Sequence, residues 1–270
     1  MSGSAWIGRK SRREERITPR QLAEFRVTFG ALLDERPVPP GFHWCLVPDL
    51  APAGDLGRDG HPRPGIFVPE LPLPRRMWAG GEIAFAREIP PDALMERVST
   101  VRDVVSKSGS TGPLAFVTID HEWLADGVPV LRERQDLVYR EDPKPGEKPK
   151  PPQAEPWDVE SAMAFAPDAT MLFRYSALTF NGHRIHYDHP YATGVEGYDG
   201  LVVHGPMQAM VMMNMASRLL GRLPSNFRYR GVSPLICGVE AVIEARPAAG
   251  GYELRTRTVD GGLTMIASAR

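Results

Sequence analysis

The sequence has few of the residues that would tie it to an oxidising compartment or to a charged partner. Only two cysteines, Cys45 and Cys237, occur among its 270 residues, which is too few for a disulfide framework and is typical of a reducing compartment. Its formal net charge of −1 gives no electrostatic reason to expect binding to nucleic acid or to an anionic membrane. Together these features favour a cytoplasmic protein that binds neither.

Long apolar runs are missing as well. The most apolar window, residues 207–220, is interrupted by Asn214, Ser217 and Arg218 and is too short to span a bilayer, so we expect a buried helix there. Residues 1–16 are polar and basic without the apolar stretch of a secretory signal, and we expect no such signal. The length suits one large domain or two of ordinary size.

The first half of the sequence predicts a helix, an irregular segment and an antiparallel meander. Thr18 followed by Pro19 is a helix start, and apolar residues recur at helical spacing over residues 19–35. Residues 36–76 are rich in Pro and Gly, which favours an ordered but irregular excursion. β-Branched residues between Gly and Pro breaks then predict strands at 82–89, 97–107, 114–123 and 128–139.

A segment with almost no apolar residues separates the two halves. Residues 142–156 are rich in Pro, Lys and Glu and cannot bury enough surface to offset the entropy cost of ordering. We interpret them as a linker between an N-terminal unit, residues 1–141, and a C-terminal unit, residues 157–270. The sequence of the second unit predicts a strand at 159–165, a helix at 169–178 capped by Asp168, and a central helix at about 206–222. It also predicts four more strands, at 227–237, 239–245, 252–259 and 263–269.

The strongest functional signal is the turn Asn181-Gly182-His183-Arg184-Ile185-His186 before the central helix. Histidine has an unperturbed pKa of about 6.5 and is the default general base near neutral pH, and His186 is our candidate. Gly205-Pro206 begins the central helix, where unpaired backbone N–H groups suit an oxygen that becomes negative. Because Gly205 has no side chain, a substrate carbonyl can approach its N–H closely.

This turn resembles the loop of the MaoC-like hydratases and dehydratases, which carries Gly-Asp-x-Asn-Pro-x-His ahead of a long helix. The final His is retained as His186, whereas the family's Asp is Asn181 and its Asn-Pro pair is His183-Arg184. The wider pattern combines three stretches and is similar to the mesaconyl-C4-CoA (3-methylfumaryl-CoA) hydratase branch, to which the mitochondrial-type 3-hydroxyacyl-thioester dehydratases are related. The stretches are residues 75–81, 179–188 and 197–206.

The resemblance implies an α+β double hot-dog fold, in which antiparallel sheets wrap around a long central helix. The N-terminal hot dog is expected to be degenerate and to shape the acyl pocket. The resemblance also assigns roles to individual residues. These are catalysis for His186, Asn181 and Gly205, and substrate binding for Arg184, His183, Arg76 and His204.

We therefore expect reversible addition of water across the C2=C3 bond of a short enoyl-CoA, with mesaconyl-C4-CoA giving citramalyl-CoA. A 3-hydroxyacyl-thioester dehydratase of fatty-acid type is the alternative. The expected chemistry requires no metal or organic cofactor, because CoA enters as part of the acyl-CoA thioester substrate. Family resemblance also implies a homodimer.

Other interpretations stay open at this point. His183, His186, Asp188 and His204 are metal ligands by type, although His-x-x-His matches poorly the helical zinc pair. A hot-dog thioesterase is disfavoured because residues 206–222 contain no Asp or Glu. The change to Asn181 is also compatible with an inactive acyl-thioester-binding subunit or with a simple turn residue. Arg184 could equally pair with a structural carboxylate.

Overall fold

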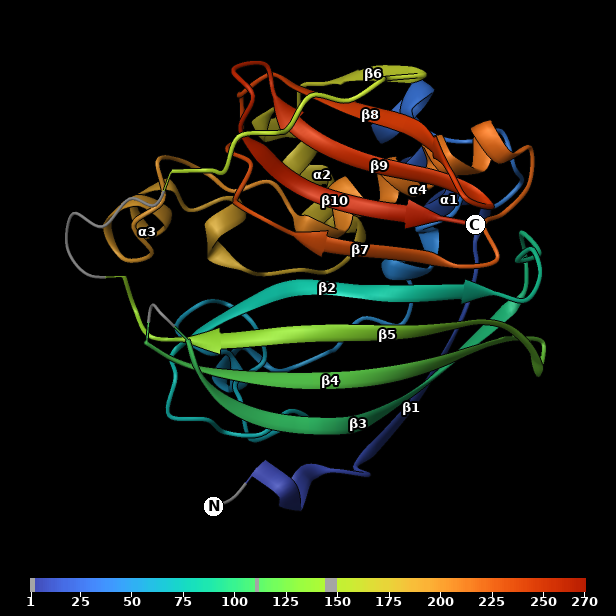
Figure 1. The fold of residues 1–270 in the computed structure, drawn as a ribbon. Helices are drawn as coiled ribbons and strands as arrows, with labels where there is room; N and C mark the ends of the chain where they lie inside the picture. Colours follow the sequence, from blue (N-terminus) through green and yellow to red (C-terminus); the bar gives the residue numbers. More distant parts are fainter. Residues whose placement is uncertain (1–2, 110–111, 144–149) are drawn as a thin grey trace.

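One ten-stranded antiparallel sheet runs through both halves of the chain (Figure 1). The computed structural model describes residues 3–109, 112–143 and 150–270. The N-terminal strands are β1 (Lys10–Arg16), β2 (Arg75–Phe85), β3 (Leu94–Gly109), β4 (Gly112–Ala125) and β5 (Val128–Arg140). The C-terminal strands are β6 (Ser161–Phe165), β7 (Phe227–Gly231), β8 (Ala241–Ala248), β9 (Gly251–Thr258) and β10 (Leu263–Ala269).

The strand order is the same from either edge of the sheet. It is β1-β3-β4-β5-β2-β7-β10-β9-β8-β6, so β2 and β7 meet in the middle and every other strand has a counterpart at equal distance from the centre. The two central strands pair from Gly80 opposite Arg230 to Ile83 opposite Phe227. Two copies of one five-stranded unit, related by an approximate twofold axis, produce this order. The predicted α+β double hot dog is thereby confirmed.

The two units differ in the helix that the sheet wraps. In the C-terminal unit, α4 (Gly205–Leu220) follows α2 (Ala169–Leu178) and α3 (His189–Gly194). In the N-terminal unit, α1 (Pro19–Phe29) is the counterpart of α2 in chain order. Between α1 and β2 the chain forms only short 3-10 turns, at Gly30–Leu32, Phe42–Cys45 and Ala53–Asp55. The N-terminal unit therefore lacks a long central helix, as expected of a degenerate copy.

Helix α4 is the centre of the main hydrophobic core. Its five methionines are at most 3% exposed and pack with residues of both units, including Phe42 and Trp123 from the N-terminal one. Unbranched thioether side chains fill irregular space well, which suits a helix enclosed on several sides. None of the helices within the described ranges combines the length and apolarity that crossing a membrane requires.

Local sequence explains where the helices begin. Thr18 and Gln21 form a capping box at the start of α1, and the Asp168 side chain accepts a hydrogen bond from the Met171 N–H at 2.7 Å at the start of α2. Helix α4 begins differently, because its N-cap residue His204 makes no side-chain capping bond. Its first-turn amides are therefore left available to another acceptor.

Several predicted boundaries were wrong for identifiable reasons. The first helix stops at Phe29, before Gly30 at φ 50°, and β7 stops at Gly231 ahead of the bend at Ser233. Strand β1 was missed because its sequence, KSRREER, has no apolar residue to give a period of two. The short α3 was missed too. Residues 142–143 and 150–156 of the predicted linker form no helix or strand, and residues 144–149 lie outside the described residues.

A buried ion pair connects β2 to the segment after α3. The Arg75 Nε donates to Glu196 Oε2 at 2.6 Å, while the Tyr191 hydroxyl donates to Glu196 Oε1 at 3.0 Å. The Arg75 guanidinium also lies over the Tyr198 ring at 5.2 Å. Arg75 and Glu196 are each about 6% exposed, so each depends on the other to offset the cost of leaving water.

Replacing Arg75 with Met should therefore lower the free energy of unfolding by about 3 kcal/mol, the usual scale for removing one member of a buried pair. Urea denaturation followed by far-UV circular dichroism measures this change. Arg20→Met is the matched control, because Arg20 makes an exposed pair with Glu24 on α1 and should have little effect. Equal stability of the two variants would show that the Arg75 pair does not hold the units together.

Candidate active site

A cavity of about 1450 Å³ takes its lining from both units. His61, Arg76 and Trp78 line it from the N-terminal unit, and His183, His186 and Gly205 from the C-terminal unit are among the other lining residues. This volume exceeds that of an ordinary small-molecule pocket. The predicted catalytic turn and the start of α4 thus face one common space.

The turn after α2 is held by its own backbone. Phe180 adopts a positive φ of 49°, and the Asn181 N–H donates to the Ser176 carbonyl at 2.8 Å. The Asn181 side-chain oxygen then accepts the His183 N–H at 3.0 Å, which is the Asx-type turn that Asn favours. Asn181 lines the cavity, and with its Oδ1 committed to the turn, its Nδ2 amide is the group left to contact a ligand.

His186 is held in one tautomer. Its Nδ1 donates to the Val202 carbonyl at 2.7 Å, so the Nε2 lone pair is left free. Its ring stacks on His204 at a centroid distance of 3.5 Å and an interplanar angle of 19°. Burial lowers the pKa of His186 to about 3, although the Val202 carbonyl opposes the shift. The imidazole is therefore neutral at physiological pH and can accept a proton.

His204 lies beneath His186 rather than on the cavity wall. Its Nε2 is 2.8 Å from the Ser176 hydroxyl, and the Tyr175 ring packs edge-on against it. Complete burial lowers the pKa of His204 well below its ordinary value, so it stays neutral. This placement suits a platform for His186; a direct contact with substrate, as the sequence suggested, stays a prediction that this geometry does not favour.

The backbone at Gly205 lies close to the ring of Trp78. A Cβ at this position would lie 2.7 Å from the ring of Trp78 on β2, which is too short for any side chain. Gly205 also provides the first residue of α4, whose N-cap supplies no side-chain bond. A backbone N–H at an uncapped helix start, in a cavity wall, has the features of an oxyanion site.

A second loop reaches the site, and the sequence analysis did not single it out. Residues 59–61 pack backbone to backbone against residues 181–183: a Cβ on Gly60 would lie 2.0 Å from the Gly182 carbonyl oxygen, and one on Gly182 would lie 2.7 Å from that of Gly60. The Arg184 N–H donates to the Asp59 carbonyl at 2.8 Å. This contact sets His61 beside His183, with ring centroids 4.3 Å apart.

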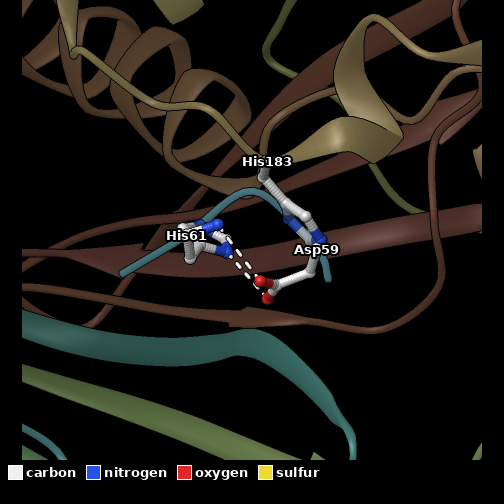
Figure 2. Close-up of side chains that lie close together, drawn as sticks. All are labelled: Asp59, His61 and His183. Carbon is white, nitrogen blue, oxygen red and sulfur yellow. Dashed lines mark hydrogen bonds and ion pairs between the residues drawn. The ribbon is translucent and has the colours of Figure 1, made fainter. Parts of the chain in front are cut away.

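Asp59 and His61 form a hydrogen-bonded pair (Figure 2). Asp59 Oδ1 accepts the His61 backbone N–H, and Asp59 Oδ2 lies 3.1 Å from His61 Nδ1. Burial alone would raise the pKa of Asp59, but His61 and the charge of Arg76 hold it below its ordinary range. Burial and Arg76 lower the pKa of His61, and burial and the neighbouring imidazoles lower that of His183. Asp59 is therefore a carboxylate among largely neutral imidazoles.

The donor atoms of Asp59, His61 and His183 lie within 4.8 Å of one another. A divalent cation could fit such a spacing by residue type. The carboxylate oxygens of Asp59 are already directed at the backbone and ring N–H groups of His61, however. We therefore interpret the group as a carboxylate that orients an imidazole.

The two arginines proposed to bind substrate are placed differently. Arg184 donates to Asp188 Oδ2 at 2.7 and 2.9 Å, lies 4.1 Å over the Tyr191 ring, and is not among the residues that line the cavity. Arg76 lines the cavity, and its guanidinium is 3.7 Å from Asp59 Oδ2. Of the two, Arg76 is the one that a bound ligand would meet.

Two polar side chains of α4 have structural partners. Asn214 is fully buried, accepts the Asp34 N–H and donates to the carbonyls of Pro40 and Met210. Gln208 accepts a hydrogen bond from the Thr264 hydroxyl at 2.8 Å. Neither is an acid or a base, and α4 contains no carboxylate that could activate water for thioester hydrolysis.

Comparison with known proteins agrees with this geometry. Residues 41–237 match the family of hydroxyacyl-thioester dehydratases type 2. The chain is 38% identical to a mesaconyl-C(4)-CoA hydratase of Chloroflexus aurantiacus, over 98% of this chain and 96% of that one. The fold is similar to that of HtdX of Mycobacterium tuberculosis, with a TM-score of 0.71 and 16% identity over 97% and 98% of the two chains.

A second protein from Mycobacterium tuberculosis, whose structure is described as a double hotdog fold, matches with a TM-score of 0.57 and 13% identity over 97% of this chain and 96% of that one. It supports the twofold strand order described above. The family match extends from the irregular N-terminal segment into the loop after β7, so it includes the Asp59–His61 loop, the turn that carries His186 and the start of α4. The chain belongs to the hydroxyacyl-thioester dehydratase type 2 family.

Proposed function

We propose that the protein catalyses reversible addition of water across the C2=C3 bond of a short enoyl-CoA. The observation that carries this proposal is His186, whose Nδ1 is fixed by the Val202 carbonyl so that a neutral Nε2 is available in the same cavity as Gly205. The name of the Chloroflexus relative supports mesaconyl-C4-CoA as the substrate, with citramalyl-CoA as the product. The family description supports the alternative, a 3-hydroxyacyl-thioester dehydratase of fatty-acid type.

Hydration by this site has two parts. His186 Nε2 accepts a proton from water as the water oxygen bonds to C3 and the C2=C3 electron pair moves toward the thioester. The Gly205 N–H, at the uncapped start of α4, stabilises the oxygen that becomes enolate-like. Asn181 orients the water through its Nδ2 amide, since its Oδ1 is already occupied by the His183 N–H.

An acyl group with a free carboxylate requires a positive partner in the cavity. Arg76 is the best placed of the two arginines that the sequence suggested, because Arg184 is engaged by Asp188 and Tyr191. A guanidinium can also meet a carboxylate with two parallel hydrogen bonds. Arg76 is therefore our candidate for recognition of a dicarboxylic acyl group.

The proposal includes three further statements about the working protein. The scheme uses only side chains and backbone amides, so it requires no metal and no organic cofactor. The two cysteines are both free thiols, which supports a reducing compartment such as the cytoplasm. We also propose a homodimer, which rests on family resemblance.

His186→Ala should lower the hydration rate by a factor of about 10² to 10⁴, the usual contribution of a general base. The assay follows loss of enoyl absorbance with mesaconyl-C4-CoA and crotonyl-CoA, and circular dichroism checks that the fold is intact. His189→Ala is the matched control, because His189 is exposed on α3 outside the cavity. A folded His186→Ala protein with near-normal turnover would remove His186 from the mechanism.

Arg76→Met should change the choice of substrate. Leaving a substrate carboxylate without its partner costs about 2–5 kcal/mol, so kcat/KM for mesaconyl-C4-CoA should fall at least about 30-fold relative to that for crotonyl-CoA. Arg184→Met is the comparison variant, and because its side chain holds the turn through Asp188, it should affect both substrates alike. If neither ratio changes, a fatty-acid-type dehydratase becomes the better assignment.

A further inference from the structure

Asn181 stands where the loop that this turn resembles carries Asp, so one of the two proton transfers has no residue assigned to it. An amide cannot accept and return a proton as a carboxylate can, and addition of water requires a proton to reach C2 after the oxygen has bonded to C3. We propose, on the basis of the proposed function, that His61 is a second proton-transfer residue and that Asp59 positions it. The N-terminal unit would then supply a catalytic group and not only a pocket wall.

The hydrogen bonds of the pair determine which atom of His61 is free. Asp59 Oδ1 binds the His61 backbone N–H and Oδ2 binds Nδ1, both at 3.1 Å. With Nδ1 directed at the carboxylate, Nε2 is the atom available to a ligand. His61, His183 and His186 all line the same cavity, and Figure 2 shows the side chains of Asp59, His61 and His183 close together, with His61 bonded to the Asp59 carboxylate.

The position of the pair is fixed relative to His186. The close approach of Gly60 and Gly182 excludes a side chain at either position, and the Arg184 N–H to Asp59 carbonyl bond adds a second anchor. Ring centroids are 4.3 Å apart for His61 and His183 and 5.3 Å apart for His183 and His186. The three imidazoles therefore form a continuous row from His61 to the proposed base.

The charges around His61 make Asp59 necessary. The titratable and charged groups that act on His61 are the carboxylates of Asp59 and Asp49, the Arg76 guanidinium on β2, and the imidazoles of His183, His186 and His204. Burial and Arg76 lower the pKa of His61, and the Asp59 carboxylate opposes them. The net pKa of His61 is lowered, so its protonated form is the minor one at neutral pH, and Asp59 is its main support, as a carboxylate beside an imidazolium.

The proton balance of hydration can be written with this pair. His186 Nε2 takes one proton from water as the C3–O bond forms, and the C2=C3 electron pair becomes the enolate of the thioester. His61, protonated beside Asp59, then gives its Nε2 proton to C2 as the enolate collapses. One proton has moved from His61 to His186, and its return along the imidazole row or through solvent restores the site. In dehydration His61 removes the C2 proton, and His186 protonates the departing hydroxyl.

His61→Gln tests this assignment through two readouts, measured with a strong chelator present. Crotonyl-CoA hydration should fall about 10²-fold or more, and exchange of the C2 protons of butyryl-CoA with D₂O should be lost. His186→Ala should lose hydration but keep the exchange, because butyryl-CoA has no hydroxyl to protonate. His189→Gln is the matched control.

The outcomes separate this inference from the proposed function. If the wild-type protein hydrates none of the enoyl-CoAs, the function is wrong. If it hydrates them and His61→Gln does so equally well, only the role of His61 is wrong. If the wild-type protein does not exchange the C2 protons of butyryl-CoA, the hydration rate of His61→Gln alone decides whether His61 transfers a proton. Loss of wild-type activity to the chelator with rescue by Zn²⁺ would overturn the proton-transfer role in favour of a metal.

Asp59→Asn tests the positioning role. The amide can still accept the Nδ1 hydrogen bond, but it removes the charge that favours protonated His61, so the pKa of His61 should fall. Since hydration uses the protonated form, the alkaline limb of the kcat/KM profile should move to lower pH. A rate loss that is uniform across the pH range, without this shift, would mean that Asp59 only holds the loop.

Discussion

The antiparallel pairing of β2 with β7 is the contact on which the site depends. It sets the N-terminal unit against the start of α4, where the Trp78 ring lies so close to Gly205 that no side chain fits between them. The segment that leads into β2 carries Asp59 and His61, so the same pairing limits where that loop can lie. Neither unit alone contains the base, the helix amides and the carboxylate–imidazole pair.

Burial favours a neutral imidazole that accepts a proton and disfavours a protonated imidazole that donates one. It keeps His186 neutral with a pKa of about 3, which preserves its lone pair but makes it a weak base. Each unit by which burial lowers the pKa adds about 1.36 kcal/mol to the cost of protonating the imidazole. Such a base therefore gains its proton only as negative charge develops on the substrate. The same burial opposes an imidazolium anywhere in the cavity. The Asp59 carboxylate, fixed beside the His61 ring, offsets part of this effect.

Sequence alone predicted the parts of the protein that depend on local pattern. The Asp168 cap, the turn that carries His186 and the start of α4 are each encoded by residues only a few positions apart. The role of Asp59 and His61 depends on a contact with residues about 120 positions away, and their own segment has only the Pro and Gly content of a loop. Arg184 was assigned to substrate from its distance in sequence to His186, although Asp188 at i+4 was an available partner.

The Asn at position 181, where the loop that this turn resembles carries Asp, agrees with the charge of the proposed acyl group. An anionic acyl group bound beside a carboxylate on the catalytic turn would be repelled in a medium where charges are poorly screened. Asn181 keeps the turn, through its bond to the His183 N–H, without adding charge. The carboxylate of Asp59 instead lies behind His61 and 3.7 Å from Arg76, where both neighbours offset it. For the proposed dicarboxylic substrate and two proton transfers, a carboxylate on the second loop is therefore better placed than one on the first.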